Sequence, residues 1–519
     1  MAVVEVEDIE EVEDVEDAED AEDVESVEDV EDVEKSSFPK RKSGTLICVA
    51  GSSRGKRDQQ AYFPYQIHPA VLTTQTMSST VTLPTAVSAP GKVLLAGGYL
   101  VLDREYTGLV FGLSARIHVV VQDIVTGSGV ELAKIVVQSP QFREATWDYG
   151  YRLVGDQCGV EVTQLQGNSS IPLSRNPFVE TALVYALTYI STLLPNATLR
   201  PTNITILADN DYYSNTSNST LPSSPFTDFA VRLQDAHKTG LGSSAALVTA
   251  FTGALLTHYI PSFTLSIPSS RSKLHNLAQA AHCAAQGKVG SGFDVAAAVY
   301  GTCIYRRFSP SILSSLGEPK SPGFATRLQN IVDDTGPQKW DTEISKNGVA
   351  IPPGMALVMC DVDCGSQTVS MVKKVLEWRT SQPADAKMLW DDLQGCNDLL
   401  AEQLGKGCVI ELQEDFVAIR ALIKDMSLAS GVPIEPDEQT ELLNAVTKAV
   451  GGVIGGVVPG AGGYDAIVLL VRDDEATIGE LTAFLERWKV QGKGNVKLLK
   501  AKGELEGARE EDAKSYGTF

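Results

Sequence analysis

Apolar residues recur at helical spacing in several long stretches of this chain, and these stretches predict its helices. Such spacing gives a helix an apolar face that can pack against a core. The helices are expected at 177–194, 244–258, 270–286, 369–380, 384–405, 412–428, 437–450 and 475–488.

Shorter, mainly apolar runs bounded by glycine or polar residues predict buried strands. These strands are expected at 92–102, 116–123, 203–208, 297–308, 356–361 and 467–471. Residues 124–170 are polar and contain glycine, and residues 209–236 form a polar insertion. Strands and helices are interspersed without regular alternation, so we expect an α+β fold.

The first 34 residues have a different pattern, in which Val, Ile or Ala recurs every third position. This period drifts by about 60° per step around a helix, so it builds no single apolar face. Nineteen acidic residues and no basic one lie here, leaving 47 acidic against 43 basic residues in the other 485. High charge favours disorder, so we predict that residues 1–80 are a disordered acidic tail and a linker. An acidic segment that binds a partner protein is the alternative.

The composition of the whole chain is that of a globular protein. With 519 residues, 43% of them hydrophobic, it can form two or three domains with substantial cores. No apolar run reaches the roughly 18 residues that span a bilayer, and no signal peptide opens the sequence. The eight cysteines are scattered without a CxxC pair, so neither a disulfide framework nor a zinc site is expected. We expect a cytoplasmic monomer or homodimer with neither a membrane nor a nucleic acid as partner.

The stretch 238–250, KTGLGSSAALVTA, carries the strongest candidate chemistry. Gly240 and Gly242 let the backbone approach a ligand closely, and free N–H groups at the start of the following helix favour phosphate. The hydroxyls of Ser243 and Ser244 can add contacts to phosphate or to a metal ion. A glycine-rich turn before a helix is by itself a weak signal, because an ordinary helix start has the same sequence pattern.

Two further glycine-rich loops flank this stretch along the chain. Residues 88–92 read SAPGK and lead through an apolar run to Gly97 and Gly98. Residues 455–466 contain Pro-Gly-Ala-Gly-Gly and precede the apolar run 467–471. Three such loops in this order, with the serine-containing loop in the middle, resemble the motifs of the GHMP kinases. That superfamily includes galactokinases, homoserine kinases, mevalonate kinases and phosphomevalonate kinases, and the resemblance covers residues 85 to about 480.

The individual residues of the motifs restrict the resemblance to one group within the superfamily. Mevalonate kinases and galactokinases carry Gly-Glu-His after the first strand, where this chain has Gly97-Gly98-Tyr99. That triplet and the stretches 286–298, 305–308 and 459–466 are similar to the fungal-type phosphomevalonate kinases.

The fold, cofactors and acceptor that we expect follow from this resemblance. It implies a ribosomal-S5-like N-terminal domain over 81–350, a ferredoxin-like C-terminal domain over 351–519 and an active site in the groove between them. It implies ATP and Mg²⁺ as cofactors and 5-phosphomevalonate as the acceptor, in the mevalonate route to isoprenoids and sterols. A kinase of mevalonate or of a sugar is the nearest alternative. A catalytically silent sensor of nucleotide and metabolite is another.

The resemblance also assigns roles to individual residues. A carboxylate between Gly292 and an apolar run must be paired or functional, and the resemblance implies that Asp294 is the catalytic aspartate. The alternative is that Asp294 caps the element that follows it. Ser244 is expected to be the metal ligand. The nucleotide is expected to contact Lys238, Gly240, Leu241, Gly242, Ser243, Ser244 and Ala245.

The acceptor site is expected to be cationic. A phosphate monoester has its second pKa near 6, so its attacking oxygen is largely deprotonated at neutral pH and needs little base catalysis. Lys92 and Lys288 are expected to act in catalysis by bridging phosphates, although a lysine beside a loop is often only solvated. Lys373, Lys374 and the segment 365–370 are further candidates for binding an anion. The acceptor is expected to contact Lys92, Ser291, Arg306, Arg307, Gly460, Gly462 and Gly463.

One position departs from the mevalonate kinases, which place a metal-binding glutamate eleven residues before the catalytic aspartate. Here that position is Cys283, with His282 and Gln286 nearby. Neither neighbour is a strong Mg²⁺ ligand, because this hard cation prefers carboxylates and water. We therefore expect the metal to rest on the nucleotide phosphates, Ser244 and water.

Overall fold

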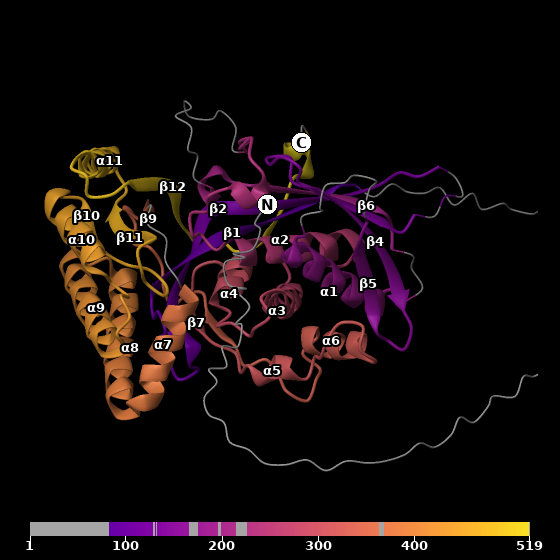
Figure 1. Cartoon of the computed structure of the whole chain (residues 1–519), viewed down its shortest axis with the longest axis horizontal. Helices are drawn as coiled ribbons and strands as arrows, with labels where there is room; N and C mark the ends of the chain where they lie inside the picture. The colour runs from indigo at the N-terminus through magenta and orange to yellow at the C-terminus, as the bar shows by residue number, and fades with distance from the viewer. Residues whose placement is uncertain are drawn as a thin grey trace, which may run out of the picture. The chain divides into compact units, whose positions relative to one another are not determined.

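One continuous β-sheet joins the two halves of the chain (Figure 1). The structure is a computed structural model, and it describes residues 83–127, 130, 132–165, 175–195, 199–213, 226–362 and 368–517. Within these ranges thirteen strands pair, and the main path runs β10-β11-β9-β12-β2-β6-β3-β4-β5. The acidic tail and linker predicted over 1–80 lie outside the described residues, so their disorder stays a prediction.

The strands of the N-terminal half form the larger part of this sheet. All their pairings are antiparallel except that of β3 with β6. Their bounds are β1 (Thr85–Ala96), β2 (Gly108–Asp123), β3 (Lys134–Gln138), β4 (Thr146–Val154), β5 (Gly159–Gln164), β6 (Thr202–Ala208), β7 (Cys303–Arg306) and β8 (Glu343–Ser345).

The strand predicted at 92–102 is displaced toward the N-terminus. Strand β1 already contains Pro90, because the register shifts between Pro90 and Lys92 and so accommodates a residue without an N–H group. The strand ends at Ala96, and Leu100–Leu102 form a short 3-10 helix, η2. Strands β3 to β5 lie in the stretch 124–170, for which we predicted no strand. Only one face of β4 is buried, so this strand carries few of the apolar residues that would have indicated it.

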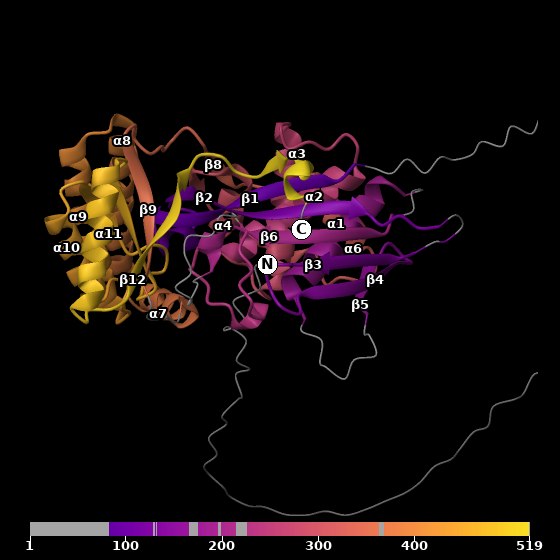
Figure 2. The same cartoon turned by 90° about the horizontal axis from the view of Figure 1, so that it is seen from above.

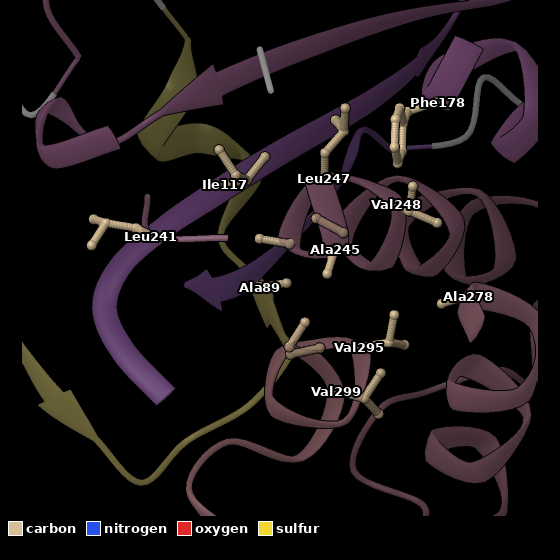
Figure 3. Packing of buried hydrophobic residues seen from close by; sticks show 14 of the residues in the cluster. Ala89, Ile117, Phe178, Leu241, Ala245, Leu247, Val248, Ala278, Val295 and Val299 are labelled. Carbon is tan, nitrogen blue, oxygen red and sulfur yellow. The ribbon is translucent and has the colours of Figure 1, made fainter. Parts of the chain in front are cut away.

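The helices of the N-terminal half pack on one another and on β1 and β2. They are α1 (Pro177–Leu193), α2 (Ser243–Tyr259), α3 (Pro268–Ala285), α4 (Phe293–Tyr300), α5 (Ser311–Ser314) and α6 (Phe324–Val332), with the 3-10 turns η3 (Asn210–Tyr212) and η4 (Leu233–Asp235). Helix α2 is buried on almost every side, as expected for a helix that is apolar all round. Figure 3 shows Leu247 of α2 and Val295 of α4 in one core with Ala89 of β1 and Ile117 of β2.

The strand predicted at 297–308 is wrong in its first half. Residues 293–300 form helix α4, and only Cys303–Arg306 are extended. The run Val-Ala-Ala-Ala-Val is apolar throughout, so its pattern fits a buried helix as well as a buried strand. Alanine favours the helix.

The C-terminal half places five helices around a small antiparallel sheet. The helices are α7 (Thr368–Ser381), α8 (Pro383–Lys406), α9 (Val409–Ser430), α10 (Asp437–Ala449) and α11 (Glu475–Val490), which confirms the five predicted there to within three residues at each end. The strands are β9 (Met355–Val362), β10 (Val453–Val457), β11 (Ala466–Arg472) and β12 (Val496–Glu504). None of the helices in the described ranges is both long and apolar enough to cross a lipid bilayer.

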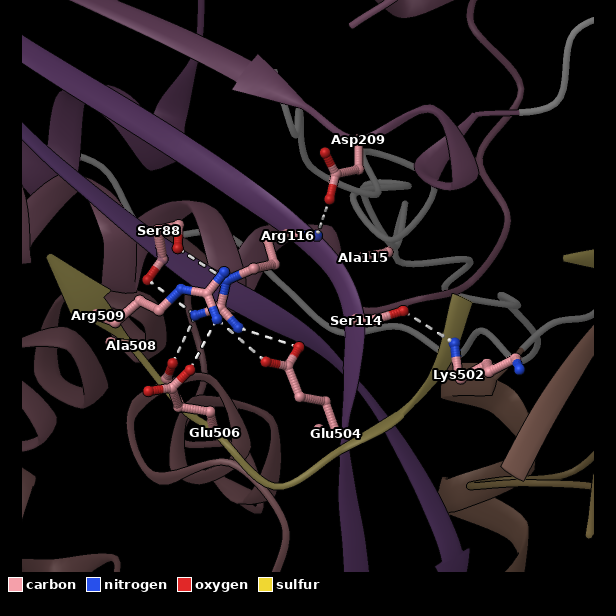
Figure 4. A network of polar contacts seen from close by, with 12 residues as sticks. Ser88, Ser114, Ala115, Arg116, Asp209, Lys502, Glu504, Glu506, Ala508 and Arg509 are labelled. Carbon is pink, nitrogen blue, oxygen red and sulfur yellow. Dashed lines mark hydrogen bonds and ion pairs between the residues drawn. The ribbon is translucent and has the colours of Figure 1, made fainter. Parts of the chain in front are cut away.

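The last part of the chain returns to the N-terminal half. Strand β12 pairs with β9 and then with β2, as Figure 2 shows from above, and β13 (Arg509–Glu511) pairs with β1, ahead of the 3-10 turn η5 (Ala513–Tyr516). Arg116, only 2% exposed, donates to the Ser88 hydroxyl at 2.7 Å and to the Gly507 carbonyl at 2.5 Å (Figure 4). Residues 503–517 thus lie against the N-terminal strands, although the predicted domain boundary between 350 and 351 assigns them to the C-terminal domain.

Candidate functional site

The middle glycine-rich loop leads directly into helix α2. Gly240 and Gly242 have φ values of +69° and +75°, in the left-handed region that favours glycine. Helix α2 begins at Ser243, and no side chain caps its first turn. Uncapped N–H groups at the positive end of a helix dipole are suited to phosphate oxygens. Ser243 and Ser244 are partly exposed there.

Lys92 of the first loop lies across this helix start. Its N–H donates to the carbonyl of Leu241 at 2.9 Å. A Cβ atom at Gly242 would lie 2.6 Å from Lys92 Cε, so any other residue at this position would require Lys92 or the loop to move. The Lys92 ammonium lies 5.7 Å from the centre of the Phe293 ring, at the start of α4. The predicted lysine is thus between the middle loop and the start of α4.

Three side chains from three helices meet beside this loop. His282 Nε2 of α3 lies 3.1 Å from Ser244 Oγ of α2. On the other side of the ring, Nδ1 lies 3.8 Å from a carboxylate oxygen of Asp294 of α4. The His282 side chain is 2% exposed and that of Asp294 is 22% exposed. The two residues that we predicted for metal binding and catalysis are therefore connected through a histidine for which we predicted no role.

Asp294 is not the N-cap of helix α4. Gly292, with φ +84° and no side chain, holds that position. The Asp294 carboxylate accepts the N–H of Val295 at 2.8 Å with one oxygen, while the other faces His282. The helix-cap alternative is therefore wrong in its literal form, although the side chain does contact the first turn.

Cys283 occupies the place of the glutamate found in mevalonate kinases, and it offers no ligand of that kind. Its sulfur accepts the side-chain amide of Gln279 at 3.2 Å. Burial raises the pKa of the Cys283 thiol, and the nearby Asp294 carboxylate acts in the same direction. Among the described residues, no three His, Cys, Asp or Glu side chains are grouped so that they could hold a metal ion.

The first and third glycine-rich loops touch through their backbones. The Gly460 N–H donates to the Leu94 carbonyl at 3.1 Å, and a Cβ atom at Gly98 would lie 2.2 Å from the Gly460 carbonyl oxygen. The Tyr99 hydroxyl donates to the Ala461 carbonyl at 2.7 Å. Tyr99 holds a positive φ of 63°, uncommon for a residue with a side chain. A glutamate at position 98 does not fit this arrangement.

The other glycines of the third loop contact the segment that connects α9 to α10. Gly462 has φ +85°, and a Cβ atom there would lie 2.2 Å from the Ile434 carbonyl oxygen. The Gly463 N–H donates to that same carbonyl at 2.9 Å. These contacts hold the loop against the C-terminal half, and the contacts of Gly460 hold it against the N-terminal half.

The structure separates Arg306 from Arg307. Arg306 donates to the carbonyls of Arg104 at 2.9 Å and Glu105 at 2.8 Å, and it pairs with Glu343 at 3.0 Å. The Arg306 guanidinium is thus engaged away from the three loops.

Arg307 instead donates hydrogen bonds to the loop that carries Lys288 and Ser291. Its guanidinium donates to the carbonyls of Val289 at 3.1 Å, Gly290 at 2.9 Å and Leu102 at 2.6 Å. Burial lowers the pKa of Arg307. Lys288 is exposed on this loop, and the Ser291 carbonyl accepts the Tyr305 hydroxyl at 2.7 Å.

The remaining candidates lie farther along the chain. Lys238 is half-buried and pairs with Tyr213 in an isolated bridge just before the middle loop. Lys373 and Lys374 are exposed on α7. Residues 365–367 of the segment 365–370 lie outside the described residues, and 368–370 begin α7, so the predicted role of the segment is untested.

A second contact that sequence reasoning missed joins the end of η2 to α7. Asp103 forms an ion pair with Arg379, whose guanidinium lies 4.1 Å from the centre of the Trp390 ring. The pKa of Asp103 is lowered by hydrogen bonds from the Glu105 N–H and Arg379, which outweigh the effect of burial. Asp103 was visible as the acidic end of the first motif, but its partner lies 276 residues away.

Known proteins with similar sequences or folds agree on the family. The family model for the GHMP kinases N terminal domain matches residues 218–302. The chain is 56% identical to a phosphomevalonate kinase of Gibberella zeae, over 83% of this chain and 97% of that protein. It is 50% identical to one of Aspergillus fumigatus, over 83% and 98% respectively.

A solved structure supports the fold independently of close sequence similarity. The phosphomevalonate kinase of Streptococcus pneumoniae, in complex with phosphomevalonate and AMPPNP, has a TM-score of 0.52 at 17% identity. The match covers 81% of this chain and 99% of that one, and it confirms the predicted two-domain α+β architecture. On its sequence similarity to the two fungal proteins, this chain belongs to the phosphomevalonate kinases, a family of the GHMP kinases.

Proposed function

We propose that this chain transfers the γ-phosphoryl group of ATP to the phosphate of 5-phosphomevalonate, giving 5-diphosphomevalonate and ADP. The observation that carries the proposal is the meeting of three glycine-rich loops. Lys92 of the first loop bonds the second loop at Leu241, and Leu94 of the same strand bonds the third loop at Gly460. The two fungal relatives, each matched over nearly their whole length, are named for this activity.

The nucleotide phosphates would bind at the start of α2. The left-handed Gly240 and Gly242 expose backbone N–H groups, and the hydroxyls of Ser243 and Ser244 stand at the same helix end. Leu241 and Ala245 are buried, so their side chains pack and only their backbone can reach a ligand. The role of Lys238 in binding nucleotide stays a prediction.

The oxygen atoms near this helix start fit Mg²⁺. Ser244 and Asp294 offer a hydroxyl and a carboxylate, the kind of ligand that this cation prefers, and both contact the same histidine ring. These two residues would hold the ion together with the nucleotide. When bound, Mg²⁺ supplies positive charge against the crowded phosphates.

The acceptor phosphate would be held by cations. Two phosphate groups repel one another, so their approach requires neutralisation more than removal of a proton. We assign this task to Lys92, which lies near the start of α4, and to Lys288, on the loop to which Arg307 donates. We assign Arg306 a structural role, because backbone carbonyls and Glu343 engage its guanidinium. Asp294 would orient the cationic groups, and the contact of Ser291 with the acceptor stays a prediction.

A single comparison of acceptors tests this function. The purified full chain is assayed for ADP release with MgATP and, in turn, 5-phosphomevalonate, mevalonate, homoserine and galactose. Phosphomevalonate should exceed mevalonate in kcat/KM by about 100-fold or more, because cations placed for a phosphate are left unpaired without it. Equal turnover of mevalonate or a sugar would favour the alternative kinases, and no turnover of any acceptor would favour the sensor. The cytoplasmic location, the monomeric or dimeric state and the domain boundaries at 81, 350 and 351 stay predictions.

A further inference from the structure

His282 stands between the two residues that we assign to the metal and to catalysis. Its Nε2 lies 3.1 Å from Ser244 Oγ, and its Nδ1 lies 3.8 Å from an Asp294 carboxylate oxygen. The three residues come from α2, α3 and α4, with sequence separations of 38 between Ser244 and His282 and 12 between His282 and Asp294. The ring therefore connects three helices that begin or end at the candidate site.

Packing fixes the orientation of this ring. The imidazole is 2% exposed, and its centre lies 5.4 Å from that of the Phe178 ring of α1, tilted by 53°. In this orientation Nε2 faces Ser244 and Nδ1 faces Asp294. Cys283, next to it on α3, turns its thiol to Gln279 instead. In this chain α3 thus reaches Ser244 and Asp294 through an imidazole.

We propose that His282 is a positioning residue that sets the Ser244 hydroxyl and the Asp294 carboxylate relative to each other. The proposal rests on the function proposed above. A carboxylate near Nδ1 favours the tautomer with its hydrogen on that nitrogen, which leaves Nε2 as an acceptor. Ser244 then donates its hydroxyl hydrogen to Nε2. The lone pairs of Ser244 Oγ are thereby left for a cation.

The same contacts explain why a histidine suits this place better than a second carboxylate. A glutamate next to Asp294 would add a second negative charge, and like charges at close range disfavour ionisation of both groups. A neutral imidazole can bond Ser244 without that repulsion. The second oxygen of the Asp294 carboxylate already accepts the Val295 N–H at 2.8 Å.

Two conservative variants separate the contacts of the two ring nitrogens. His282→Gln places an amide near the position of Nε2 and can bond Ser244, whereas His282→Asn places one near Nδ1 and can reach toward Asp294. His282→Ala removes both contacts. His275→Gln is the matched control, because His275 is also a buried histidine of α3, 3% exposed, but it faces Asn276, Tyr300 and Trp340.

The first measurement is steady-state kinetics of the full chain with MgATP and 5-phosphomevalonate. His282→Ala should lower kcat by about 10- to 100-fold while changing the KM for phosphomevalonate by less than about threefold, the result of disturbing catalytic groups rather than acceptor binding. His282→Gln and His282→Asn should each recover part of the loss. His275→Gln should keep the kcat of the unchanged protein.

The second measurement is the binding of AMPPNP by calorimetry, with Mg²⁺ and with EDTA. The gain in affinity that Mg²⁺ gives should fall by about tenfold in His282→Ala and His282→Asn, and His282→Gln should retain most of it. Binding without metal should be the same in all variants. If His282→Ala does not fold, the difference in Mg²⁺-dependent affinity between His282→Gln and His282→Asn still tests the proposal.

Two results would overturn the proposal. One is a kcat of His282→Ala no lower than that of His275→Gln, and the other is a metal-dependent affinity that is equal in the Gln and Asn variants. An unchanged protein that does not phosphorylate phosphomevalonate would instead overturn the proposed function. The two failures are thereby distinguished.

Discussion

Helices α2 and α4 begin in a different way from α1 and α11. The first pair starts after a left-handed glycine, Gly242 or Gly292, and no side chain bonds the first turn from the cap position. The second pair starts at a capping side chain. Asn176 accepts the Val179 N–H at 3.3 Å, and Asp474 accepts the Thr477 N–H at 2.8 Å.

The difference separates helix starts that are complete from those that are open to a ligand. A cap satisfies a backbone donor within the chain and stabilises the helix. A glycine start leaves these donors for another partner and lets other groups approach. Here Lys92 lies against Gly242, and the Asp294 carboxylate stands in the first turn after Gly292. Substitutions at the two kinds of start should therefore have opposite effects on activity and stability.

The largest effect is expected for Asp294→Asn. The amide can still accept the Val295 N–H, so helix α4 should keep its stability, but the negative charge is lost. We expect kcat to fall by about 100-fold or more, the usual result of removing a preorganised polar group from an active site. Binding of AMPPNP without Mg²⁺ should change little. Turnover close to that of the unchanged protein would show that the open start of α4 has no part in catalysis.

An intermediate effect is expected for Gly242→Ala. A left-handed conformation costs a residue with a side chain about 1–2 kcal/mol, and the new Cβ would also lie 2.6 Å from Lys92 Cε. We expect the KM for ATP to rise by about tenfold, since Lys92 or the loop must move.

Gly431→Ala is the control for Gly242→Ala. Gly431 has φ +66° at the end of α9, and no atom lies within 4 Å of the Cβ position. The control should lose similar stability and keep the KM for ATP. An equal change of that KM in both variants would mean that backbone strain alone, and not the contact with Lys92, is responsible.

The smallest effect on activity is expected for Asn176→Ala. Asn176 is fully buried, and its side chain caps α1. Loss of the cap should lower the free energy of unfolding by about 1 kcal/mol, measured by denaturant or thermal unfolding. Both kcat and the KM values should stay as they are. Lost turnover at unchanged stability would place α1 in the site and remove the contrast between the two kinds of helix start.

The parts of the site that could be predicted from the sequence are those fixed by local chemistry. Gly240 and Gly242 adopt a left-handed backbone conformation that few other residues adopt, so the glycines in the sequence already indicate a tight loop there. The C-terminal helices were predictable for a related reason, since each carries its own periodic apolar face. Helix α4 was not, because a short run of Val and Ala has no period that distinguishes a helix from a strand.

The contacts that the sequence could not predict join residues far apart in the chain. Arg306 and Arg307 are adjacent and chemically identical, yet side chains of successive residues in an extended chain point to opposite sides. One is therefore bound near Glu343, and the other near Gly290. His282 was visible beside Cys283, but its contact with Ser244 depends on how α2 packs against α3. Neither the contacts of the two arginines nor that of His282 is indicated by the residues next to them in the sequence.

The return of the final strands to the beginning of the chain bears on how the protein folds during synthesis. Strand β13 pairs with β1, and Glu511 accepts the hydroxyl of Ser88, 423 residues earlier, at 2.6 Å. Until those last residues leave the ribosome, the outer edge of β1 has no neighbour to complete its hydrogen bonds. An unpaired strand edge is a place where nascent chains associate with one another. The nascent polypeptide must keep its first strand from such encounters, by its own folding order or with a chaperone, for almost the whole of its translation.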